Sequence, residues 1–141
     1  MADETSLATI RAAVETILPR TEDLPGGVDL GVERHVVEQM ELYLPGFTEL
    51  IATLLDAYAS GTPFVELDRP GREAVIREMV HDESQDVREA IDAVFVFALG
   101  GMFSEWTGLD RSTGDLTPPP TWAAMGFRGP SDGYASYRED A

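Results

Sequence analysis

The sequence contains neither cysteine nor lysine, and it contains only two histidines. The missing cysteines exclude disulfide bonds, thiolate metal ligands and cysteine nucleophiles. Long apolar runs are also missing, because the longest, at 93–103, is about half of the roughly 20 residues that a membrane span needs. The first residues, MADETSLATIR, lack the basic region, twin arginine and apolar core of an export signal. We therefore expect a chain with no signal peptide or membrane span of its own, located in the cytoplasm or held at a membrane through a partner.

Positive charge is scarce as well. The chain has 26 acidic residues against ten basic ones, all of them arginine, and its net charge is −16. This excess opposes binding to nucleic acid through phosphate, and it destabilises the compact state by self-repulsion unless ions screen it. Because molar salt shortens the Debye length to about 3 Å, we interpret the acidic surface as halophilic. An acidic tail for a basic partner fits less well, since the acids are spread along the chain.

Apolar residues recur at helical spacing in five segments that turn residues separate. Helices are predicted at about 5–18, 32–43, 47–60, 69–80 and 84–106. Thr5 or Ser6 is the expected N-cap of the first helix, and Asp68 that of the fourth. The predicted fold is all-α: a small bundle of about five helices at 1–106 and a long irregular C-terminal arm at 107–141, together one domain. The positions predicted to face the core include Leu7, Ile10, Val14, Val36, Met40, Leu44, Leu50, Ile51, Leu55, Ile91 and Val94.

One pair of residues has the spacing of a metal site. Glu78 and His81 form Glu-x-x-His, which di-iron proteins of the ferritin type use twice, together with further inward carboxylates. The other histidine is His35. The residue three positions before it, where the motif needs glutamate, is Val32. A solvent-exposed helix end is the simpler interpretation. A free-standing helical protein with its own metal or acid/base site around Glu78 and His81 remains the alternative function.

The arm concentrates aromatic residues among prolines and glycines, where no long helix can form. Its rings either fold back to complete the core of the bundle or contact another protein, and some can do each. Interfaces favour tryptophan, tyrosine, phenylalanine, methionine and arginine. The predicted partner interface consists of Phe103, Trp106, Trp122, Met125, Phe127, Arg128 and Tyr134.

Several short motifs, in order along the chain, resemble the gluconate 2-dehydrogenase subunit 3 family. The segment ILPRTEDLPGGVDLGV resembles the family's Ile-Pro loop, FVFALGGMFSE resembles its apolar helix leading into a Phe-Ser element, and TWAAMGFRGP resembles its Trp and Gly-Phe-Pro-Gly-Pro ending. The matching residues are Pro19, Pro25, Gly26, Gly31, Val32, Leu99, Gly100, Phe103, Ser104, Trp122, Gly126, Phe127, Gly129 and Pro130.

The chain also departs from the family pattern. TGLDRSTGD replaces a Tyr-Gly-Gly-Asn-like loop, Arg128 stands where proline is common, and the twin-arginine signal of many members is missing. The resemblance implies a non-catalytic subunit, without a cofactor of its own, that stabilises or matures a large flavoprotein of the glucose-methanol-choline oxidoreductase type. FAD would belong to that partner, and a cytochrome subunit accompanies some such complexes.

Overall fold

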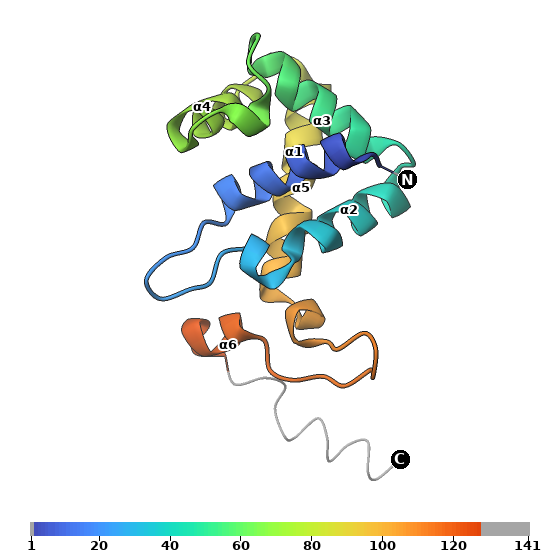
Figure 1. The fold of residues 1–141 in the computed structure, drawn as a ribbon, viewed down its shortest axis with the longest axis vertical. Helices are drawn as coiled ribbons and strands as arrows, with labels where there is room; N and C mark the ends of the chain where they lie inside the picture. The colour runs from blue at the N-terminus through green and yellow to red at the C-terminus, as the bar shows by residue number, and fades with distance from the viewer. Residues whose placement is uncertain (1, 128–141) are drawn as a thin grey trace.

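The computed structural model describes residues 2–127, and this range forms helices and no strand. The α-helices are α1 (Glu4–Ile17), α2 (Val32–Tyr43), α3 (Phe47–Tyr58), α4 (Arg69–Val80), α5 (Gln85–Phe103) and α6 (Pro120–Met125), with short 3-10 helices η1 (Val28–Leu30), η2 (Phe64–Glu66) and η3 (Glu105–Gly108). Figure 1 shows α5 running lengthwise through the molecule, crossed by α1 and α2, with α3 and α4 towards its N-terminal end and α6 at its C-terminal end. The all-α fold is confirmed.

The core forms where the apolar faces of α1 to α4 meet α5. Ile91, Val94 and Ala98 lie at helical spacing on the inner face of α5 and are at most 1% exposed. They pack together with fully buried residues of the crossing helices, because each of those helices has an apolar stripe of its own. The fully buried residues of the other helices include Ile10, Val14, Val36, Met40, Ile51, Leu55 and Met79.

Polar side chains fix the starts of two helices. The Asp68 carboxylate accepts a hydrogen bond from the Gly71 amide at 2.9 Å, which confirms Asp68 as the N-cap of α4. The first helix begins earlier than predicted, because Asp3 and not Thr5 or Ser6 caps it. The Asp3 carboxylate accepts from the Ser6 amide at 2.7 Å.

Three residues predicted to face the core are exposed. Leu7, Leu44 and Leu50 have 39%, 49% and 48% of their surfaces accessible, so the prediction was wrong for them. On α3 the buried face consists of Phe47, Thr48, Ile51, Ala52 and Leu55, which leaves Leu50 outside it. The bundle therefore has apolar surface left over after its core is complete.

The described part of the arm folds back on the bundle. Within the arm, the backbone amide of Thr117 donates a hydrogen bond to the carbonyl of Gly108 at 2.9 Å, so the chain approaches itself closely there. A Cβ at position 108 would overlap the Thr117 carbonyl, so the close approach needs glycine there. The described part of the arm includes the short helix α6, which the expected irregular arm did not contain. Prolines at its start and Gly126 at its end, at a φ of 71°, restrict α6 to six residues.

Candidate partner interface

The residues predicted to contact a partner fall into three groups. Met125 and Phe127, at the end of α6, are 51% and 49% exposed. Phe103, Trp106 and Trp122 are half-buried against their own chain. Arg128 and Tyr134 lie outside the described residues.

Side chains of α6 hold the C-terminal end of α5. The last carbonyls of any α-helix have no partner within the helix. Here the buried Thr121 hydroxyl donates to the Met102 carbonyl at 3.0 Å, and the Trp122 ring nitrogen donates to the Phe103 carbonyl at 3.3 Å. The Phe127 ring packs edge-on against the Trp122 ring, with centroids 4.9 Å apart. The segment from Thr121 to Phe127 thus caps the central helix and still presents part of its apolar surface to solvent.

The arm contacts the bundle at a second place, which we call the Trp106 cluster. It consists of His35, Glu38, Trp106 and Arg111. The rings of His35 and Trp106 lie 5.1 Å apart, and the Arg111 guanidinium lies over the Trp106 ring. Arg111 also donates to both carboxylate oxygens of Glu38, at 2.6 and 3.0 Å. Those hydrogen bonds lower the pKa of Glu38, while burial lowers the pKa of His35. The Trp106 ring is therefore occupied by contacts within its own chain.

The central helix is apolar on more faces than the core covers. The run 93–103 has no polar side chain, and its inner face is buried as described above. Val96, Leu99 and Phe103, spaced at i, i+3 and i+7, share another face that we call the outer stripe. Val96 is 57% and Leu99 44% exposed, and Phe103 is half-buried. A helix that is apolar all round is normally buried all round, so the outer stripe marks a surface suited to contact.

Near its N-terminal half, α5 borders an apolar groove that we call the α3–α5 groove. Leu50 and Leu54 line it from α3, Val96 and Phe97 line it from α5, and Tyr43 closes it from the end of α2. Its volume is about 790 Å³. Three carboxylates border it, and no histidine or arginine is among its lining residues. The carboxylates are those of Asp86, Glu89 and Asp92.

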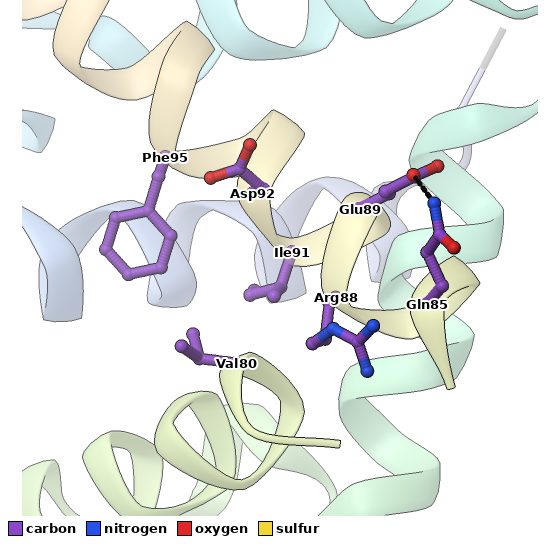
Figure 2. Close-up of a pocket in the computed structure, with 7 residues that line it drawn as sticks. All are labelled: Val80, Gln85, Arg88, Glu89, Ile91, Asp92 and Phe95. Atoms are coloured by element: carbon purple, nitrogen blue, oxygen red, sulfur yellow. Dashed lines mark hydrogen bonds between the residues drawn. The ribbon is translucent and has the colours of Figure 1, made fainter. Parts of the chain in front are cut away.

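A smaller groove of about 590 Å³ lies on another side of α5, against the end of α4 (Figure 2). Val80 and Phe95 provide apolar walls, and Glu89 receives a hydrogen bond from Gln85 at 2.6 Å. Arg88 donates to the backbone carbonyl of Asp82 at 2.5 Å, so the guanidinium is bound to its own chain. The lining includes no histidine, serine or threonine. This arrangement offers no nucleophile with a base beside it.

Glu78 and His81, the residues of the alternative function, lie on an exposed helix end. His81 is the C-cap of α4, where its amide donates to the Arg77 carbonyl at 3.2 Å, and both side chains are exposed. Within residues 2–127, no group of three or more histidine, aspartate or glutamate side chains is placed to hold a metal ion. His35 lies apart from this pair, in the Trp106 cluster.

Sequence reasoning did not identify Leu42, Tyr43, Leu50, Val96 and Leu99 as exposed apolar residues. They are between 44% and 79% accessible. A signal was present in the run 93–103, because a helix in a chain of this size rarely buries every face. The pattern of the run by itself predicts only the continuation of a core helix.

Comparison with known proteins tests the resemblance. A family model described as gluconate 2-dehydrogenase subunit 3 matches residues 4–105, which covers α1 to α5. The arm residues 107–141 lie beyond the match. Searches of curated proteins and of solved structures returned no match. Among the helices of the described range, none combines the length and the apolarity needed to cross a bilayer. The match over most of the bundle shows that the chain belongs to the gluconate 2-dehydrogenase subunit 3 family.

Proposed function

We propose that this chain is a non-catalytic small subunit that binds a large FAD-dependent sugar or alcohol dehydrogenase and stabilises or matures it. The family name identifies a subunit of a dehydrogenase complex. The partner we infer is a flavoprotein of the glucose-methanol-choline oxidoreductase type, with or without a cytochrome subunit. The location of the chain then follows that of the complex, in the cytoplasm or at a membrane.

The outer stripe is the observation that supports this proposal most directly. Val96 and Leu99 leave about half of each side chain in water, although burial of a whole aliphatic side chain is worth about 1.5–3 kcal/mol. Met125 and Phe127 add apolar surface beyond the C-terminal end of α5. Contiguous exposed apolar patches rimmed by polar residues are typical of interaction sites. A partner that covers the outer stripe would recover this free energy.

The proposal assigns the redox chemistry to the partner. We expect FAD in the large subunit and no cofactor in this chain. Neither groove along α5 is lined by a serine, threonine or histidine, and the Glu78–His81 pair has no further metal ligand within residues 2–127. Metal analysis of the purified chain checks this expectation. Stoichiometric iron that disappears in His81→Ala would instead favour the alternative, a self-contained metal protein.

Coexpression tests the proposed function itself. We expect a gene for a large FAD-binding oxidoreductase beside the gene for this chain. The two proteins are coexpressed, and the complex is isolated by size exclusion in molar KCl. We expect a yellow complex in which both subunits are present in equal amounts. We also expect the large subunit alone to be less soluble or to bind less FAD. If the flavoprotein is equally stable and active without this chain and never binds it, the proposal is wrong.

A further inference from the structure

The α3–α5 groove has a charge pattern that restricts what can occupy it. Its walls are apolar, its rim carries Asp86, Glu89 and Asp92, and no basic side chain lines it. An occupant with apolar side chains at the walls and positive charges at the rim would complement this groove. A second copy of this chain that docks through the same groove fits poorly, because it would place the same three carboxylates directly against those of the rim.

The shape of the groove indicates the length of the occupant. It follows α5 from Asp86 to Phe97, which is a rise of about 16 Å or three helical turns. Its side walls are the two helices α3 and α5, and a third helix that packs against two others inserts its ridges of side chains into the grooves between theirs. Recognition of this kind uses apolar anchors at i, i+3 or i+4, and i+7 of the inserted helix.

The position of the groove extends the surface already assigned to the partner. Val96 belongs to both the outer stripe and the wall of the groove, so the two surfaces are continuous along α5. The groove lies towards the N-terminal end of α5, whereas α6 packs on the carbonyls of Met102 and Phe103 at the other end (Figure 1). The groove thus adds a contact separate from the arm.

Resting on the proposed function, we propose that the α3–α5 groove binds an amphipathic helix of the large dehydrogenase subunit. This helix is about three turns long. Its apolar face packs between Leu50 and Val96, and its arginine or lysine side chains pair with Asp86 and Glu89. The groove thereby selects a partner segment by charge as well as by apolar fit.

The test measures the dissociation constant between this chain and the purified large FAD subunit in 0.5 M KCl. Val96→Asp places a charge on the apolar wall, and Asp86→Arg reverses a charge on the rim. Asp23→Arg is the matched control, because Asp23 is an exposed aspartate in the loop after α1. Val96 and Asp86 are exposed as well, so circular dichroism should show all three variants folded. We expect at least tenfold weaker binding for Val96→Asp and Asp86→Arg, and less than twofold change for Asp23→Arg.

A photo-reactive phenylalanine analogue at position 96 then identifies the occupant by mass spectrometry. A crosslink to a helical segment of the large subunit with arginine or lysine beside apolar residues supports the proposal. Tight binding by either groove variant, or a crosslink to a segment without basic residues, overturns it and leaves the proposed function standing. A dimer of the isolated chain that Val96→Asp dissociates overturns it in favour of self-association. If the wild-type chain binds no large subunit at all, the proposed function fails and this inference fails with it.

Discussion

Thr121→Val should reveal how strongly the arm is attached to the central helix. The Thr121 side chain is 0% exposed, and its hydroxyl donates to the Met102 carbonyl. Valine has nearly the same shape but no donor. The substitution therefore leaves the carbonyl at the end of α5 without its hydrogen bond and changes the packing very little.

The size of the effect follows from that unpaired carbonyl. A buried polar group that loses its partner costs about 1–3 kcal/mol. For a chain of 141 residues, the entropy of unfolding corresponds to about 0.3 kcal/mol per degree. If the arm unfolds together with the bundle, Tm should fall by about 3–10 °C. If the arm opens separately, the same free energy should appear as faster amide exchange in α6 and in the last turn of α5.

Thermal melts and hydrogen exchange of the isolated chain, both in molar KCl, measure these quantities. Thr117→Val is the control, because the Thr117 hydroxyl also donates to a carbonyl, that of Gly108 at 3.1 Å, but on an exposed part of the arm. Solvent can replace that bond, so we expect a change of less than about 0.5 kcal/mol. Equal melting and equal exchange for Thr121→Val and the wild type would refute the view that α6 caps α5.

The remaining predictions concern the arm rings, salt and pH. Trp122→Ala should destabilise the isolated chain by about 1–3 kcal/mol, because the half-buried ring also donates a hydrogen bond. Phe127→Ala should melt like the wild type and lose affinity for the large subunit in pull-down titrations. The reverse pattern would exchange the roles of the two rings. Tm should rise steeply from dilute buffer to molar KCl, because salt screens the net charge of −16, and equal Tm at both extremes would contradict the halophilic interpretation. Burial lowers the pKa of His35 in the folded chain, so the unfolded chain binds more protons and stability should decrease as pH falls below about 6.5; a His35→Phe melt series should lack that slope. The bond to Arg111 lowers the pKa of Glu38, so it stabilises the folded chain above about pH 4.5, and this stabilisation is lost on further acidification. Glu38→Gln should abolish this pH dependence of Tm.

The helices of the bundle could be predicted from the sequence because their signals are local. The N-cap at Asp68 and the limits of α2 and α4 depend on residues within one or two turns of each helix end. The cap of α1 was misplaced because Asp3, Thr5 and Ser6 are all good N-caps. Only the geometry shows that the Asp3 carboxylate reaches the Ser6 amide.

The short helix α6 could not be predicted, because its stability depends on distant partners. The Thr121 and Trp122 side chains bond carbonyls that lie 19 residues earlier in the chain. An isolated helix of six residues is unstable in water, so prolines and glycines dominate the local signal and indicate irregular structure.

The candidate interface was only partly predictable for a related reason. Helical periodicity tells which residues share a face, but α5 and α3 each have more apolar residues than one face holds. Which residues are left exposed depends on how the helices cross. The exposed Leu50 and Val96 follow from the contacts of Ile51 and Val94 with the core, not from their own sequence neighbours.

The central helix α5 is also the last helix of the bundle to be synthesised, so the core can be completed only late in translation. Its residues are synthesised after those of α1, α2, α3 and α4, all of which pack around the core to which α5 contributes Ile91 and Val94. Until α5 emerges, the apolar faces of the earlier helices have no complete core to enter. A nascent chain in that state exposes the surface that makes folding intermediates prone to aggregate. Release of a chain that stops before α5 should therefore yield insoluble fragments, and folding becomes productive only when the last helix of the bundle leaves the exit tunnel.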